Sequence, residues 1–110
     1  FAMAEPELLR YGPHDEQYLH VYRPRDSNGD PKLAILVHGG FWKSKYSVNN
    51  ALTTEVAGAL SERGWSVADV EYRRVGQDGG GWPGSNVDVL CALAFIHENL
   101  QRIVKSDARP

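Results

Sequence analysis

The spacing of apolar and polar residues changes several times along the chain, and each change predicts a new element. From Gln17 to Arg23, Leu19 and Val21 alternate with more polar residues, which is typical of a strand with one wetter face at the edge of a sheet. The run from Leu33 to Val37 is apolar throughout, as expected of a central strand covered on both faces. Because residues 26–31 between them are rich in turn formers, we expect these two strands to form a hairpin.

A helical period and then a second strand follow. Between Ser47 and Arg63 the apolar residues recur at a spacing of four, and Gly64 stands where a helix often ends in a glycine. The segment from Trp65 to Tyr72 returns to strand character. Together with the strand at Leu33 to Val37, these segments predict a right-handed βαβ crossover with two parallel strands.

The last predicted element is a helix capped by Ser85 and Asp88 that ends near Val104. Its predicted inward face is formed by the apolar residues Val89, Leu93, Ile96 and Leu100. No repeat or low-complexity tract occurs, so residues 1–110 are expected to form one α/β domain or part of one. We place residues 1–4 outside the fold, as a tag or processing remnant.

Composition excludes several classes of function. The net charge of −2 offers no basic excess for nucleic acid or anionic lipid, and the five apolar residues from Leu33 to Val37 fall far short of a membrane span. Cys91 is the one cysteine, which excludes an intrachain disulfide. It lies in a helical apolar pattern, so we expect a buried structural thiol and a cytoplasmic protein.

The candidate chemistry lies directly after the apolar strand, in the run His38-Gly39-Gly40-Phe41-Trp42. A buried strand followed by two glycines places bare backbone N–H groups at the carboxyl edge of a sheet, where open α/β folds bind ligands. Such a loop suits an oxyanion, and the alternative is a tight turn that binds nothing. No Gly-x-Ser-x-Gly occurs in the chain, so the sequence shows no nucleophile for such a site.

Two other kinds of site are less consistent with the sequence. The glycines at 79–81 are followed by Trp82 and Pro83, whereas a phosphate-binding loop requires Lys and then Ser or Thr. We therefore expect a surface loop that leads through Pro83 into the last helix, with Trp82 at the rim of the site. The four histidines lack the spacing of metal ligands, so we expect neither a metal nor a cofactor.

The order of these motifs resembles the amino-terminal part of the α/β-hydrolase fold. The similarity is to the His-Gly-Gly-Phe/Tyr-Trp group, which includes kynurenine formamidases (arylformamidases) and related carboxylesterases. It rests on residues 33–42 as the third strand with its oxyanion loop, on Val70 to Arg74 as the end of the fourth strand, and on residues 79–83 followed by Asp88. The implied fold is a three-layer αβα sandwich that lacks its nucleophile-bearing half.

This resemblance implies roles for individual residues. The backbone N–H groups of Gly39, Gly40 and Phe41 would hold the oxyanion, with glycines used because the substrate approaches closely and a Cβ would oppose the backbone angles. His38 would orient the loop by hydrogen bonding, the alternative being a general base.

The resemblance also suggests roles for three side chains near the loop. Trp42, like Phe41, would line an acyl or aryl pocket or simply pack. Arg73, which follows Tyr72, would form an ion pair that braces the oxyanion loop, the alternative being a site for a substrate carboxylate.

The sequence departs from this family pattern in its catalytic residues. The resemblance places the serine after a fifth strand, and the acid and histidine later still, so none of the three is in this chain. One hypothesis is therefore the amino-terminal part of a hydrolase of esters or N-formyl amides, whose remaining carboxy-terminal part is supplied by another chain, removed by cleavage or simply not among these residues. The other is a catalytically inactive module that pairs through the exposed edge of the strand at Lys32 to Val37, for example with a second copy.

Overall fold

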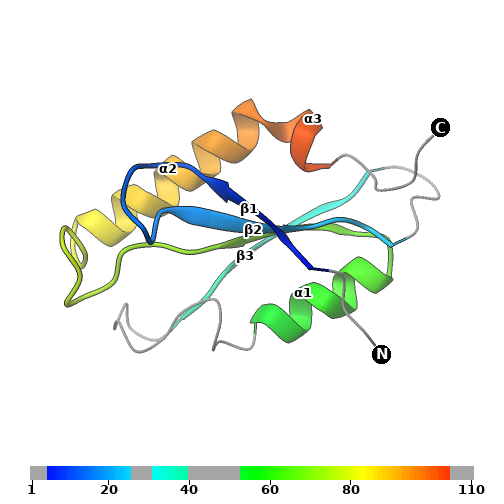
Figure 1. The fold of residues 1–110 in the computed structure, drawn as a ribbon, viewed down its shortest axis with the longest axis horizontal. Coiled ribbons are helices and arrows are strands. Elements are labelled where there is room, and N and C mark those ends of the chain that lie inside the picture. The colour runs from blue at the N-terminus through cyan, green and yellow to red at the C-terminus, as the bar shows by residue number, and fades with distance from the viewer. Residues whose placement is uncertain (1–4, 26–30, 40–52, 105–110) are drawn as a thin grey trace.

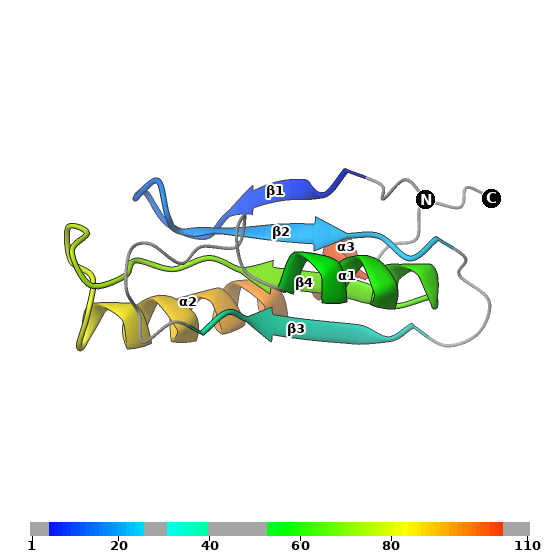
Figure 2. The ribbon, with the colours of Figure 1, turned by 90° about the horizontal axis from the view of Figure 1, so that it is seen from below.

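The computed structural model describes residues 5–25, 31–39 and 53–104. In these ranges the chain forms a mixed four-stranded sheet with helices on both faces (Figure 1). The strands and helices, in chain order, are β1 (Glu7–Arg10), β2 (Tyr18–Tyr22), β3 (Leu33–Val37), α1 (Thr53–Glu62), β4 (Ser66–Val70), α2 (Gly84–Glu98) and α3 (Leu100–Ile103). The order across the sheet is β1-β2-β4-β3, which Figure 2 shows from below.

The predicted βαβ crossover is confirmed. Strands β3 and β4 are parallel, with Leu33 opposite Ser66 and Val37 opposite Val70, and α1 connects them. Gly64 follows α1 with a φ of 90°, the left-handed conformation that glycine adopts readily. Residues 47–52 of the predicted helix lie outside the described residues.

The predicted hairpin between β2 and β3 is wrong. Strand β4 lies between them, and β2 is antiparallel to both β1 and β4. Strand β2 is therefore an interior strand rather than the predicted edge, and the unpredicted strand β1 covers its other side. Strand β3 forms the end of the described sheet, and its Ile35 and Val37 are 39% and 44% exposed.

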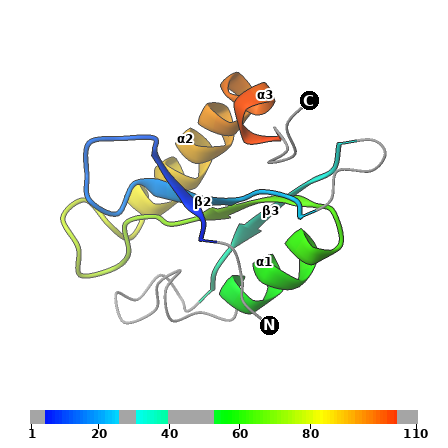
Figure 3. The same cartoon turned by 45° about the vertical axis from the view of Figure 1, so that its right-hand side comes forward.

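The two faces of the sheet carry separate apolar clusters. Helix α1 covers one face, whereas α2 and α3 cover the other (Figures 1 and 3). The larger cluster joins β1, β2 and β4 to α2 and α3 through Leu9, Leu19, Val21, Ala68, Val70, Ala92, Ile96 and Ile103. The smaller one consists of Tyr22, Ala57 and Val67, with Leu36, Leu60 and Trp65 packed against it.

The inward face of α2 differs from the prediction. Its buried residues are Ser85, Asp88, Ala92 and Ile96, whereas Leu93 and Leu100 are exposed and Val89 is half-buried. Of the predicted face, only Ile96 is buried in the core. The reason is that Asp88 makes buried hydrogen bonds, so the helix turns a polar side chain inward.

Two smaller predictions about α2 are also wrong. Pro83 occupies the N-cap position, and Ser85 lies within the first turn, where its hydroxyl donates to the carbonyl of Arg73 and accepts from the N–H of Gly81. Cys91 is exposed rather than buried. Within the described ranges, neither α1, α2 nor α3 has the length and apolar character needed to cross a membrane.

Candidate functional site

The candidate site lies at the carboxyl ends of β3 and β4. His38 and Gly39 follow β3, and Glu71 and Tyr72 follow β4. Because the two strands are parallel, these residues meet at the same edge of the sheet, where α/β folds place their ligands. The other predicted residues of the oxyanion loop, Gly40, Phe41 and Trp42, lie outside the described residues.

His38 is buried, and it contacts Gly39 and the two residues that follow β4, Glu71 and Tyr72. Its Nε2 lies 2.7 Å from Oε1 of Glu71, and its Nδ1 lies 3.0 Å from the carbonyl oxygen of Gly39. The ring of Tyr72 stacks on the imidazole with 4.5 Å between centroids, and the Tyr72 hydroxyl donates to the carbonyl of His38 at 2.7 Å. Burial and the nearby Glu71 raise the pKa of Tyr72 to about 12, so the phenol keeps the proton that it donates.

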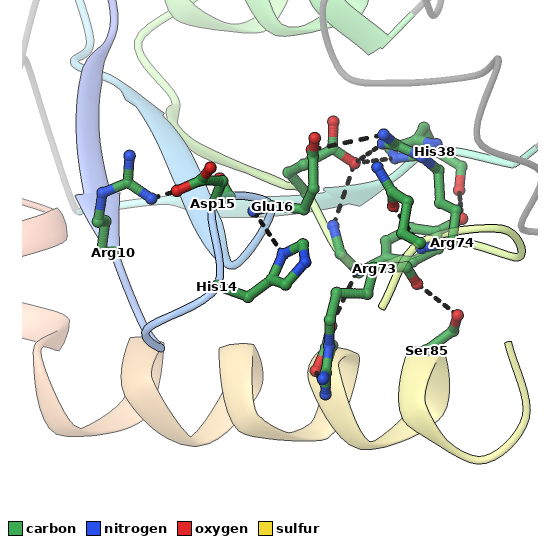
Figure 4. A network of polar contacts seen from close by, with 12 residues as sticks. Arg10, His14, Asp15, Glu16, His38, Arg73, Arg74 and Ser85 are labelled. Atoms are coloured by element: carbon green, nitrogen blue, oxygen red, sulfur yellow. Dashed lines mark hydrogen bonds and ion pairs between the residues drawn. The ribbon is translucent and has the colours of Figure 1, made fainter. Parts of the chain in front are cut away.

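Glu71 is the centre of this polar network, and the sequence prediction missed it. Its Oε1 accepts from the backbone N–H of Tyr72 at 3.1 Å and from Arg74 at 2.5 Å. Arg74 in turn lies 3.4 Å from Glu16 in the β1–β2 connection. Figure 4 shows Arg74, His38 and Glu16 gathered together, away from Arg73. The sequence signal for Glu71 is an acidic and a basic residue three positions apart directly after a buried strand. Residues at that position lie at the carboxyl edge of the sheet, where the site is.

Arg73 forms an ion pair with Asp88, and within the described residues it does not contact His38 or Gly39 of the predicted oxyanion loop. Its Nε and one terminal nitrogen donate to the two carboxylate oxygens of Asp88 at 2.9 and 2.8 Å, and its backbone N–H donates to the same group. Gln17 adds a fourth hydrogen bond to Asp88. Burial opposes ionisation of Asp88, yet the hydrogen bonds from Arg73 and Gln17 outweigh it and lower the pKa of Asp88. Arg73 therefore fastens β4 to α2, and the contacts to His38 come from Glu71, itself braced by Arg74.

Gly39 differs from the other glycines near the site. A Cβ added to Gly39 would meet no atom of the described residues within 4 Å, and its φ is not in the left-handed region, contrary to the expectation that the backbone angles require glycine there. By contrast, a Cβ on Gly80 would lie 1.9 Å from the carbonyl oxygen of Arg74, and one on Gly84 would lie 1.6 Å from that of Gly79. Packing thus explains Gly80 and Gly84, whereas the space beside Gly39 is open.

The glycine-rich loop is the surface loop that the sequence predicts. Gly79 and Gly81 have φ values of 79° and 82°, and the loop ends at Pro83, which precedes α2. Trp82 is 77% exposed. Its predicted place at the rim of the site stays a prediction. Among the residues that the structure describes, no group of three or more His, Cys, Asp or Glu side chains could hold a metal ion.

The sheet, the opposed helices and the glycine segment after β3 define an α/β-hydrolase type of fold. Solved esterases share it: Est2 of Thermogutta terrifontis, a thermophilic esterase, superposes with a TM-score of 0.76 at 18% identity, over 94% of this chain and 38% of its own. Esterase B of Lactobacillus rhamnosis gives 0.71 at 22% identity, over 88% of this chain and 30% of its own.

The chain itself belongs to the BD-FAE family, whose pattern matches residues 19–107. A bifunctional GH43-CE protein of Bacteroides eggerthii also superposes, with a TM-score of 0.71 at 22% identity over 96% of this chain. This chain spans 38% and 30% of the two esterases and 14% of the bifunctional protein. Comparison with curated protein sequences gave no significant match.

Proposed function

We propose that this chain forms the amino-terminal part of a serine hydrolase of carboxylic esters and contributes its oxyanion loop. The observation that carries the proposal is the open face of Gly39, directly after a histidine that is fixed through both its ring and its carbonyl. A rigid entry to a backbone segment with free space beside it suits the close approach of a substrate carbonyl. Membership of the BD-FAE family and the similarity to solved esterases also support the proposal of an ester hydrolase.

In this proposal the backbone N–H groups of Gly39, Gly40 and Phe41 hold the negative oxygen of the tetrahedral intermediate. Oriented amides need no rearrangement as the charge forms, and losing one such donor costs about 2.7–4 kcal/mol in comparable sites. Trp42 and Trp82 would line the acyl or leaving-group side of the pocket. His38 would position the loop and Arg73 would hold the end of β4 against α2, and neither would contact the substrate.

The catalytic serine, acid and histidine would come from a segment outside these 110 residues. Helix α2 covers the opposite face of the sheet from α1 (Figure 3). The right-handed crossover from β3 through α1 leads to β4. Because α2 lies on the opposite face of the sheet, a right-handed crossover from β4 through α2 must lead in the opposite direction, toward β3. Any further strand would then pair with the exposed edge of β3 and bring its own carboxyl end beside Gly39. The exposed Ile35 and Val37 fit such a partner.

The finer substrate class is proposed from the motif at residues 38–42. The His-Gly-Gly-Phe-Trp run is similar to that of arylformamidases, so N-formyl amides are the second substrate class to test beside simple carboxylic esters. Both reactions form a tetrahedral oxyanion and use the same loop. Esterase B has been solved with a tributyrin phosphonate, and a phosphonate of this kind is the suitable probe for a serine nucleophile.

The test replaces Gly39 by Ala in an enzyme assembled from this chain and the serine-bearing part. Among residues 5–25, 31–39 and 53–104, no atom lies within 4 Å of the new methyl group, so urea unfolding should be unchanged. The methyl group would occupy the space of the substrate carbonyl, and kcat/KM for a short ester should fall about 100-fold, the scale of a lost oxyanion donor. Unchanged kcat/KM would refute the role of Gly39. Separately, phosphonate-sensitive turnover by the chain alone would refute the claim that the nucleophile lies elsewhere.

A second candidate function is a catalytically inactive module that assembles through β3, and the exposed apolar edge favours it. Under this hypothesis sedimentation should show self-association, which Val37→Lys should abolish because a charge blocks edge pairing. Val56→Lys is the matched control, since Val56 is equally exposed but lies on α1. A chain that stays monomeric at every concentration would exclude pairing between copies.

A further inference from the structure

We infer that His38 is an imidazolium in the folded protein, and that its ion pair with Glu71 is the positioning device for the first peptide unit of the oxyanion loop. The catalytic meaning of this inference rests on the proposed function, but its geometry does not. The two ring nitrogens face two different oxygens: Nε2 faces Oε1 of Glu71 at 2.7 Å, and Nδ1 faces the carbonyl of Gly39 at 3.0 Å. His38 is 3% exposed, so water does not replace either partner.

The hydrogen-bonding roles of the two oxygens determine the protonation state of the ring. The Gly39 carbonyl can only accept a hydrogen bond. Oε1 of Glu71 also receives the backbone N–H of Tyr72 and the guanidinium of Arg74, so it too is an acceptor and its carboxylate is ionised. Both nitrogens of His38 must therefore donate. A neutral imidazole carries one N–H and an imidazolium carries two, so the geometry is satisfied by the cation alone.

The charges around His38 balance in the same state. Glu71 and Arg74 follow β4, and Glu16 reaches Arg74 from the β1–β2 connection. With His38 charged, these four groups carry two positive and two negative charges, whereas a neutral His38 would leave one negative charge uncompensated. Burial alone would disfavour the charged ring, but the hydrogen bonds to Glu71 and Gly39 outweigh both burial and the repulsion from Arg74 and raise the pKa of His38.

Two further titratable groups lie close to this cluster. Asp69 is on β4, two residues before Glu71, and interacts electrostatically with His38; its raised pKa makes it neutral over most of the acidic range. Tyr72, stacked on the ring, stays protonated. Neither group supplies a second anion that could replace Glu71 below neutral pH, so the charge state of His38 depends on Glu71.

The imidazolium has a direct consequence for the loop. A carbonyl and the N–H of the same trans peptide unit point in opposite directions because the unit is planar. By donating to the Gly39 carbonyl, His38 fixes the direction of that carbonyl, while Tyr72 holds the carbonyl of His38 itself and with it the N–H of Gly39 in the same peptide unit. A neutral ring that donates to Glu71 would face the Gly39 carbonyl with a lone pair and repel it. The Gly39 carbonyl then loses its fixed direction.

Nitrogen-15 NMR of the histidine rings in the full chain tests the charge state without any activity measurement. In the native protein at neutral pH both ring nitrogens of His38 should show the shifts of protonated nitrogen, with a titration midpoint above 6.5, the ordinary value for histidine. The carbonyl carbon signal of Gly39 should titrate with the same midpoint. His97, exposed on α2, is the internal reference.

The Glu71→Gln variant keeps the size of the side chain but removes its charge. With the stabilising anion gone, burial and Arg74 should bring the midpoint of His38 below 6.5. Tyr72→Phe is the matched control: it removes the hydroxyl that holds the His38 carbonyl but keeps the stacked ring, so the midpoint should remain above 6.5. A native His38 with one unprotonated nitrogen at neutral pH overturns the inference, as does an unchanged midpoint in Glu71→Gln.

Activity of the assembled enzyme gives a second readout that a purely structural role would not change. As pH rises through the NMR midpoint of His38, kcat for an ester should fall at least tenfold while KM stays constant, and in Glu71→Gln this decline should move to lower pH. A kcat with no inflection at that midpoint would overturn the positioning role. Failure of the proposed function is distinguishable, since it would give no ester turnover in any assembled form while leaving the NMR result intact.

Discussion

Asp69 should make the stability of the protein fall as pH rises. It lies in the middle of β4, fully buried, and within the described part of the chain neither of its carboxyl oxygens makes a hydrogen bond of good geometry, although Thr53 is close enough to lower its pKa slightly. Its neighbours across the sheet are His20 and Leu36, and the hydroxyl of Thr53 lies near it at the start of α1. Burial raises the pKa of Asp69 to about 7, with a further increase from Glu71; the nearby Thr53 and His38 offset part of this.

The magnitude follows from the difference between the folded and unfolded pKa values. The folded value of about 7 is above the ordinary value of 3.8, so the folded protein binds this proton more tightly than the unfolded chain. The stability is therefore greatest below the unfolded pKa and is lost as pH rises toward the folded pKa. At about 1.4 kcal/mol per unit, the shift of roughly three units corresponds to about 4 kcal/mol. A domain with a total stability of about 5–15 kcal/mol would show this clearly.

The Asp69→Asn variant removes the charge and keeps the shape. Urea unfolding of both proteins, followed by tryptophan fluorescence from about pH 4 to pH 8, gives the difference in unfolding free energy at each pH. That difference should shift by about 4 kcal/mol in favour of the variant across this range, because the native carboxylate must ionise without a partner. The contributions of the other titrating groups cancel in this difference in unfolding free energy, because both proteins contain them.

Asp15→Asn is the matched control for Asp69→Asn. Asp15 is exposed and its hydrogen bond from Arg10 uses the backbone carbonyl, which the substitution keeps. Its unfolding free energy should follow that of the native protein within about 0.5 kcal/mol at every pH. A pH-independent difference between Asp69→Asn and the native protein would refute the assignment of a raised pKa to Asp69.

Two other substitutions test the supports of the site. Arg73→Ala should lower the unfolding free energy by about 3 kcal/mol at neutral pH, because it leaves the buried carboxylate of Asp88 without its main partner. Since the folded pKa of Asp88 is below 3.8, urea titrations should show a smaller loss as pH falls below that value. A loss that is constant with pH would contradict the ion pair. Gly80→Ala should lower the thermal unfolding midpoint strongly, because its Cβ would overlap the carbonyl of Arg74, and an unchanged midpoint would show that the loop is not packed there as described.

The local elements of this fold could be predicted from the sequence, but the pairing of its strands could not. The four-residue spacing before Gly64 and the apolar run after Lys32 are local signals, and both elements are present. The hairpin failed because β2 pairs with Val67 to Val70, about fifty residues away, in place of β3. A turn-rich segment shows where the chain reverses, not which strand occupies the neighbouring position. The polar tips of Tyr18 and His20 also made an interior strand resemble an edge.

The same limit applies to the site. The position of His38 and Gly39 at the end of an apolar strand could be predicted, since it depends on their neighbours in sequence. Which arginine supports them could not, because Arg73 and Arg74 are adjacent and their side chains leave on different sides of the chain. The difference is decided by Asp88 on α2 and by Glu71, which follows β4, that is, by tertiary contacts.

The inward face of α2 was predicted wrongly for a reason that bears on the proposed assembly. It is apolar on two sides: Ala92 and Ile96 pack on the sheet, whereas Leu90 and Leu93 face outward, with Leu90 66% exposed. A helix with apolar residues on two sides suits packing on both of those sides. Leu90 also borders a hollow of about 330 Å³ that Val37 at the end of β3 helps to line. Leu90 and Val89 of α2 and Val37 of β3 thus meet at one hollow, at the edge where the proposed further strand would pair by the right-handed crossover rule. The two-sided pattern that misled the assignment of the inward face is what a helix between two packed layers requires.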